Sequence, residues 1–282
     1  MTSVLKLTRW GAARLTASPT PQLDSEVLLA HVLNCNRAEL YARIDPPSWW
    51  QTWRFRRLIA QRGRGVPAAY LTGHKEFFGL DFLVNRHVLI PRPETETIVK
   101  RALRLIQEWH LPIVYEVGTG SGNIAVALAH HLPGLRVVAS DAFKETLAVA
   151  RRNARRHGVE DRIELVHADL GQHITEADLV VANLPYVPTD YKARREIFFE
   201  PAQAVFVKDD GLALYKQFLI QTKFRLAVIE LGPWQLDRLL PWLTSNLPHH
   251  AVEVVRDESG YVCGLQLTAP GSGDGSDQLP RQ

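Results

Sequence analysis

Apolar and polar residues recur at helical spacing over the first part of the chain. The pattern is clear in "DSEVLLAHVLN" from Asp24 and in "SWWQTWRFRRLIAQRGRG" from Ser48. Asp24 and Ser48 are residue types that cap helix N-termini, while Gly63 and Gly65 end the second segment. Nothing in this part alternates as a strand does. The pattern therefore predicts a small helical bundle over residues 1–75.

The pattern changes after residue 75. "FFGLDFLVNRHVLI" has β-type residues interrupted by Gly79 and Asn85, which predicts a β-hairpin connector over residues 76–90. Over residues 91–268, helical segments alternate with β-branched strands, and this alternation indicates an α/β fold with a doubly wound sheet. Only "DESG" separates the last two predicted strands, so they form a hairpin and at least one strand is antiparallel. The Gly-, Ser- and Pro-rich tail, 269–282, is predicted to be disordered.

Composition excludes several classes of protein. The chain has 282 residues, of which 46% are hydrophobic, yet no apolar run is long enough to predict a transmembrane helix. Its two cysteines, Cys35 and Cys263, give neither a disulfide framework nor a metal spacing. The histidine pairs have no ligand partners at a suitable spacing either, so no metal site is expected. We expect a monomer in a reducing, cytoplasmic compartment.

The positive charge is concentrated in the predicted bundle. Residues 1–75 hold eleven Lys or Arg and four Asp or Glu, and the rest of the chain has a net charge of −4. This asymmetry is compatible with an anionic partner for the bundle, although on charge alone a basic, solvated helix face is the simpler explanation. Residues 1–23 are basic and contain several Ser and Thr, as in a mitochondrial transit peptide, but their apolar spacing favours a first amphipathic helix.

Three successive predicted strands end in residues that suit a nucleoside. The first strand leads into a glycine loop formed by Gly118, Thr119, Gly120, Ser121 and Gly122. Such a loop lets a ligand lie against bare N–H groups, but a plain strand–helix turn has the same glycines, and the spacing differs from the dinucleotide fingerprint. Asp141 ends the next strand and can accept from both hydroxyls of a ribose. Asp169 ends the third and can accept from an adenine amino group, with Leu170 packing on the base. Together these residues predict a nucleoside ligand without a pyrophosphate.

This arrangement resembles the Rossmann-like methyltransferases that use S-adenosylmethionine. The resemblance implies a seven-stranded sheet whose seventh strand is antiparallel, which agrees with the final predicted hairpin. It also implies that the listed loop and strand-end residues, together with Asn183, bind S-adenosylmethionine.

The segment "VVANLPYVP", residues 180–188, places a polar amide and a rigid turn at the end of a predicted strand. "NLPY" resembles the "(N/D)PP(Y/F)" motif of methyltransferases that act on planar nitrogen. The resemblance implies that the Asn183 side-chain oxygen and the Leu184 carbonyl each accept one N–H of the substrate. Pro185 would fix the turn and Tyr186 would stack on the planar group. Leu184 stands where many relatives have Pro, and "NLPY" also resembles the ribosomal RNA adenine dimethyltransferases.

Longer segments distinguish these families. Residues 70–96, "YLTGHKEFFGLDFLVNRHVLIPRPETE", resemble the segment that joins the two domains of the glutamine methyltransferases of peptide chain release factors, the PrmC/HemK family. "EPAQAVFVKDDGLALYKQFL" from Glu200 and "IELGPWQ" from Ile229 do so too.

The resemblance implies methyl transfer from S-adenosylmethionine to the side-chain amide nitrogen of the glutamine in the GGQ motif of a release factor, without direct nucleic-acid binding. Because residues 1–75 carry the excess positive charge and the glycine loop lies in the later domain, we expect the bundle to recognise the release factor. Two alternatives remain: a methyltransferase for amino groups of nucleic acid, and an adaptor of the same fold that has lost turnover.

Overall fold

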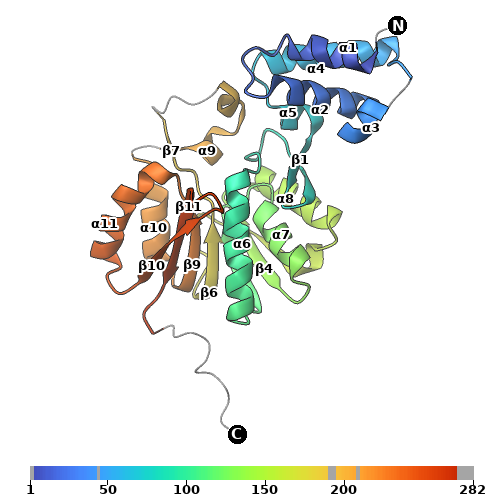
Figure 1. Cartoon of the computed structure of the whole chain (residues 1–282). Helices are drawn as coiled ribbons and strands as arrows, with labels where there is room; N and C mark the ends of the chain where they lie inside the picture. Colours follow the sequence, from blue (N-terminus) through green and yellow to red (C-terminus); the bar gives the residue numbers. More distant parts are fainter. Residues whose placement is uncertain (1–2, 43–44, 190–194, 208–209, 272–282) are drawn as a thin grey trace. The chain divides into compact units, whose positions relative to one another are not determined.

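The computed structural model describes residues 3–42, 45–189, 195–207 and 210–271. The described chain divides into two compact units, coloured by position in the sequence in Figure 1. The first unit consists of the described residues up to 74 together with residues 195–200. The second consists of the remaining described residues from 75 onward.

The first unit is helical, as the apolar spacing predicts. α4 begins after Ser48, whose side chain accepts from the Gln51 N–H while the Gln51 side chain accepts from the Ser48 N–H. α2 begins at Pro21 and not at Asp24, because proline suits the first helical position, where no N–H is needed. The helices are α1(Val4–Ala12), α2(Pro21–Leu33), α3(Arg37–Ala42), α4(Trp49–Gly63), α5(Ala68–Thr72) and the short η2(Arg195–Phe199).

Arg62 of α4 and Asp24 of α2 form a buried ion pair. The Arg62 side chain is buried, and its Nε lies 2.6 Å from Asp24 Oδ2. Arg62 also pairs with Glu196 of η2, so an ion pair joins a segment distant in sequence to this unit. By contrast, Arg54, Arg56 and Arg57 of α4 are exposed. The basic surface of α4 therefore consists of these three arginines without Arg62.

Next along the chain, the predicted hairpin is present as β1(His74–Phe77) and β2(Leu80–Leu83), paired in a two-stranded sheet. It is shorter than the connector predicted over residues 76–90. Phe77 and Phe82 are fully buried and belong to the core of the second unit.

The second unit contains the seven-stranded sheet, in the order β10-β11-β9-β6-β3-β4-β5. β11 is antiparallel to both of its neighbours, while the other pairs are parallel, so the predicted sheet and final hairpin are confirmed. The strands are β3(Ile113–Val117), β4(Arg136–Asp141), β5(Ile163–His167), β6(Ala177–Ala182), β9(Phe224–Glu230), β10(Ala251–Arg256) and β11(Val262–Thr268).

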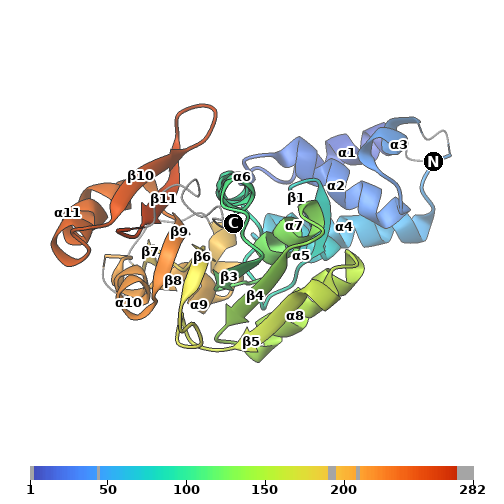
Figure 2. The same cartoon turned by 90° about the horizontal axis from the view of Figure 1, so that it is seen from below.

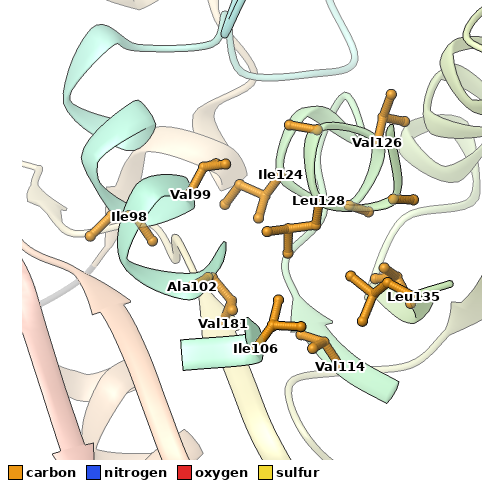
Figure 3. Close-up of a cluster of buried hydrophobic side chains, with 14 of the residues drawn as sticks. Ile98, Val99, Ala102, Ile106, Val114, Ile124, Val126, Leu128, Leu135 and Val181 are labelled. Atoms are coloured by element: carbon orange, nitrogen blue, oxygen red, sulfur yellow. The ribbon is translucent and has the colours of Figure 1, made fainter. Parts of the chain in front are cut away.

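Helices cover both faces of this sheet (Figures 1 and 2). Alternate strand residues point to opposite sides: Val181 belongs to one core, and Val180 and Ala182 to the other. Figure 3 shows the first core, where Val99 of α6 and Ile124 of α7 pack above the sheet. α8 lies on the same face, and α10 and α11 on the opposite one. These helices are α6(Pro93–Glu108), α7(Asn123–His131), α8(Lys144–Arg156), α10(Ala213–Gln221) and α11(Leu236–Asn246).

Several short elements escape prediction because too few residues define a period. They are η1(Glu160–Arg162), β7(Val187–Pro188), α9(Ala202–Val205), β8(Phe206–Val207) and η3(Pro233–Gln235). Most of the predicted disordered tail, residues 272–282, lies outside the described residues. Among the described helices, none has the length and apolar character needed to cross a membrane.

Candidate active site

A cavity of about 270 Å³ lies at the carboxyl ends of the parallel strands in the second unit. Parallel α/β sheets bind ligands at this edge, because the loops that leave the strands open there. The cavity brings together most of the site residues predicted from sequence: Gly118, Thr119, Gly120, Ser121, Asp141, Asp169, Leu170, Asn183, Leu184 and Pro185. Gly122 and Tyr186 do not line it.

The glycine loop follows β3 and needs its glycines for conformational reasons. Gly118, Gly120 and Gly122 all have positive φ, at 77°, 58° and 79°, which side chains disfavour. A Cβ on Gly118 would lie 3.1 Å from Leu184 Cδ2, so this glycine also allows the loop to approach the NLPY segment. A Cβ on Gly122 would meet Ala150 of α8 at 3.1 Å. Gly122 thus serves helix packing, while Gly118 and Gly120 border the cavity.

Asp141, the last residue of β4, is bonded to the loop backbone. Its Oδ2 accepts from the Gly120 N–H at 3.0 Å, and its Oδ1 accepts from the Phe143 N–H at 3.1 Å. Burial raises the pKa of this carboxyl, and these backbone N–H groups act in the opposite direction. Asp141 therefore holds the loop in shape and also presents a carboxylate to the cavity.

Asp169 and Leu170 follow β5 and line the cavity, as expected for an adenine contact. Leu170 has φ +47° although it is not glycine. Residues held in this left-handed region are uncommon and cluster at functional sites. The backbone here directs a buried leucine side chain against the cavity.

Glu116 is a site residue that the sequence analysis missed. It lies in β3, is fully buried, and lines the cavity. Its Oε2 accepts from Thr119 Oγ1 at 2.6 Å and from the Ala125 N–H at 3.2 Å, whereas its Oε1 has no hydrogen-bond partner among the described residues. Burial raises the pKa of this carboxyl to about 8. Its position as a charged residue within the otherwise apolar strand "IVYEVG" could have indicated its role.

Three carboxyl groups thus border one cavity: Glu116, Asp141 and Asp169. Arg92 and His87 line it as well. Acceptors on three neighbouring strand ends suit a ligand with hydroxyl donors and positive charge, because a cation lowers the cost of ionising a buried carboxyl. S-adenosylmethionine, with its ribose, sulfonium and ammonium groups, meets this requirement.

The NLPY segment follows β6, and its backbone is fixed by a tyrosine on α10. The Leu184 N–H donates to the hydroxyl of the fully buried Tyr215 at 3.0 Å. That hydroxyl lies 2.6 Å from the Glu230 carbonyl and 3.1 Å from the Leu184 carbonyl. Its single proton favours the nearer acceptor, so the Leu184 carbonyl keeps acceptor capacity.

Asn183 lies at the cavity with its amide oriented by a neighbour. Its Nδ2 donates to Thr95 Oγ1 at 3.2 Å, and among the described residues its Oδ1 accepts no hydrogen bond. The Tyr186 hydroxyl lies 3.4 Å from Glu230 Oε1, and its ring centroid lies 6.0 Å from that of Trp234. Thr95 and Glu230, like Glu116, were not predicted as site residues.

Comparison with known proteins identifies the relatives of this chain. The PrmC N-terminal domain family matches residues 6–73, and a methyltransferase domain family matches residues 114–204. The release factor glutamine methyltransferase of Rhodopirellula baltica is 33% identical over 92% of this chain and 94% of its own length. That of Bacillus anthracis is 32% identical over 91% of this chain and 96% of its own length.

Solved structures agree on the fold. The METTL16 catalytic domain in complex with a MAT2A 3′UTR hairpin superimposes with a TM-score of 0.55 at 16% identity, covering 76% of this chain and 82% of that chain. The N-terminal domain of human METTL16 in complex with SAH gives a TM-score of 0.50 at 18% identity, covering 68% and 76%. Similarity at this level concerns the fold alone. Relatedness over nearly the whole chain and the methyltransferase sheet lead to one conclusion: the protein belongs to the release factor glutamine methyltransferase family.

Proposed function

We propose that the protein transfers a methyl group from S-adenosylmethionine to N5, the side-chain amide nitrogen, of the glutamine in the GGQ motif of a peptide chain release factor. Family membership supports the reaction class. The observation that carries the proposal is that Asn183 and Leu184 both line the cavity. The Asn183 side-chain oxygen and the Leu184 carbonyl would offer one acceptor to each N–H of a primary amide.

The residues that would hold S-adenosylmethionine border the cavity together. Asp141 would accept from the ribose hydroxyls, and Asp169 from the adenine amino group, with Leu170 against the base. The backbone of the glycine loop and Glu116 would lie beside the cationic end of the molecule. When bound, S-adenosylmethionine supplies an electrophilic methyl group on a sulfonium, which is a good leaving group.

The NLPY segment would position the substrate. An amide nitrogen is a weak nucleophile because its lone pair is delocalised into the carbonyl, so orientation must supply much of the rate. Asn183 Oδ1 and the Leu184 carbonyl would each accept one N–H and hold the nitrogen towards the methyl group. Tyr186 would contact the planar amide. The extra proton can leave after methylation, so no strong general base is needed.

The helical unit would recognise the release factor. Its net positive charge and the exposed arginines Arg54, Arg56 and Arg57 suit acidic groups on a protein partner. The domain limits that we assign are a recognition bundle over residues 1–75, the connector over 76–90 and the catalytic domain over 91–268. We propose that the protein acts as a monomer in the cytoplasm, without direct nucleic-acid binding.

Mass spectrometry of a release factor incubated with the protein and S-adenosylmethionine tests this function. We expect a gain of one methyl group on the glutamine of the GGQ motif. A release factor with that glutamine replaced by alanine is the matched control and should gain none. Methylation at another residue, or equal methylation of the control, would contradict the proposal.

A further inference from the structure

A buried chain of hydrogen bonds connects three elements of the second unit to the NLPY segment. Thr95 lies in the first turn of α6, Glu230 ends β9, and Asn183 follows β6. β6 and β9 are adjacent and parallel, with Ala182 opposite Ile229. Asn183 Nδ2 donates to Thr95 Oγ1 at 3.2 Å, and Thr95 Oγ1 donates to Glu230 Oε2 at 2.5 Å. Thr95 and Glu230 are 1% and 2% exposed, so water does not compete for these groups.

The protonation state of Glu230 sets the direction of these hydrogen bonds and therefore determines which way the Asn183 amide faces. A threonine hydroxyl has one proton to donate and can accept through its lone pairs. An ionised Glu230 can only accept, so the Thr95 proton points to Glu230 and the lone pairs of Thr95 face Asn183. Asn183 must then present its NH2 group to Thr95. Its oxygen is left for the cavity, where a substrate N–H needs an acceptor.

We propose that Glu230, acting through the Thr95 hydroxyl, is a positioning residue that sets the side-chain amide of Asn183 with its oxygen towards the substrate nitrogen. The role in catalysis rests on the proposed function, whereas the orientation of Asn183 does not. Asn183 remains the catalytic residue, and Thr95 and Glu230 act through it.

Protonation of Glu230 would reverse the direction of these hydrogen bonds. Its carboxyl O–H can donate to Thr95, which frees the Thr95 proton to point at Asn183. The amide then turns its oxygen to Thr95 and its NH2 group to the cavity, where that group opposes the NH2 of the substrate. Methylation should therefore decline on the acid side of the Glu230 titration.

The surroundings of Glu230 place this titration near neutral pH. Burial raises its pKa to about 7, and Glu94 acts in the same direction. The Thr95 and Tyr186 hydroxyls and Arg92 oppose this rise. Burial raises the pKa of two further titratable groups, the phenol of Tyr215 on α10 and the thiol of Cys263 on β11, and the Glu230 charge acts on both in the same direction.

Nuclear magnetic resonance tests the orientation without any substrate. In protein labelled with ¹⁵N-asparagine, the side-chain NH2 signals of Asn183 are assigned by their loss in Asn183→Asp. We expect these signals to shift with pH, with a midpoint near 7 in the wild type and no such midpoint in Glu230→Gln or Thr95→Val. The matched control is Thr222→Val, which removes another buried hydroxyl of this unit that does not line the cavity. It should titrate as the wild type does.

Kinetics then test the catalytic consequence. Using a GGQ peptide, we expect Thr95→Val to lower kcat by about tenfold to a hundredfold, as for loss of a well-placed acceptor, with an unchanged Kd for S-adenosylmethionine. Its profile of kcat against pH should lose the decline below pH 7, and Thr95→Ser should restore both rate and decline.

The outcomes separate the two proposals. Asn183 signals that do not titrate in the wild type, or that titrate alike in Glu230→Gln, overturn the positioning role whatever the activity. A wild-type pH profile in Thr95→Val overturns it too. Signals that titrate as expected in a protein that methylates neither the peptide nor intact release factor would leave the orientation standing and refute the proposed function. If Thr95→Val does not fold, the NMR titrations of Asn183 in the wild type and in Glu230→Gln still test the positioning role.

Discussion

Replacement of Asn183 by alanine removes the acceptor that we assign to the substrate amide. The half-buried side chain makes one hydrogen bond among the described residues, to Thr95, so its loss costs about 1 kcal/mol of folding free energy. A domain of ordinary stability, about 5–15 kcal/mol, stays folded after such a loss.

The expected effect on catalysis is larger than the effect on stability. Loss of one preorganised hydrogen-bonding group in an active site costs about 3 kcal/mol in the transition state, or about a hundredfold in rate. The acceptors assigned to S-adenosylmethionine, chiefly Asp141 and Asp169, remain in place. We therefore expect kcat to fall by about two orders of magnitude while the Kd for S-adenosylmethionine changes little.

Initial rates with a GGQ peptide, calorimetry with S-adenosylmethionine and thermal unfolding measure the three quantities separately. Asn246→Ala is a matched control, because Asn246 lies exposed on α11 and its Nδ2 also makes one hydrogen bond, to the Trp242 carbonyl. The control should keep its rate. A folded Asn183→Ala protein with nearly normal kcat would refute the role assigned to Asn183.

Four further changes have defined outcomes. Asp141→Ala should weaken S-adenosylmethionine binding by about tenfold or more, because the ribose acceptor and the anchor of the glycine loop are both lost; an unchanged Kd by calorimetry would contradict this. Leu184→Pro should lower stability, because the N–H bond to Tyr215, worth about 1 kcal/mol, and part of a buried side chain are lost, and should keep activity, since the carbonyl remains; activity at background would contradict this. Replacing Arg54 and Arg57 by glutamate should slow methylation of intact release factor at low salt but not of a GGQ peptide, and an equal effect on both would exclude electrostatic recognition. Burial raises the pKa of Glu116 to about 8, so the folded state keeps a proton that the unfolded state releases near pH 4.5; stability by chemical denaturation should fall as pH rises between these values, and Glu116→Gln should reduce this slope to the part that Glu230, with its pKa of about 7, contributes.

The sheet and the glycine loop could be predicted because their signals are local. The β-branched strands, the glycines with positive φ and the hairpin before β11 each depend on residues within about ten positions of one another. The start of α2 could also have been predicted from local sequence, although we placed it at Asp24, because Pro21 suits a first helical position better than Asp24 suits a cap.

The burial of Arg62 and the position of Thr95 could not be predicted in the same way. Arg62 pairs with Glu196, 134 residues later, and Thr95 bonds to Glu230, 135 residues later. No spacing rule connects such positions, because the fold alone brings them together. A basic helical sequence predicts a solvated face, and only the structure shows which of its arginines has a buried partner.

The most direct measurement offers tritiated S-adenosylmethionine to the protein with release factor, ribosomal RNA and DNA in parallel reactions. We expect label in the release factor, at the glutamine of its GGQ motif, and none in either nucleic acid. Label in RNA or DNA without label in the release factor would contradict this expectation, and the chemistry of the NLPY segment would then belong to a base amino group.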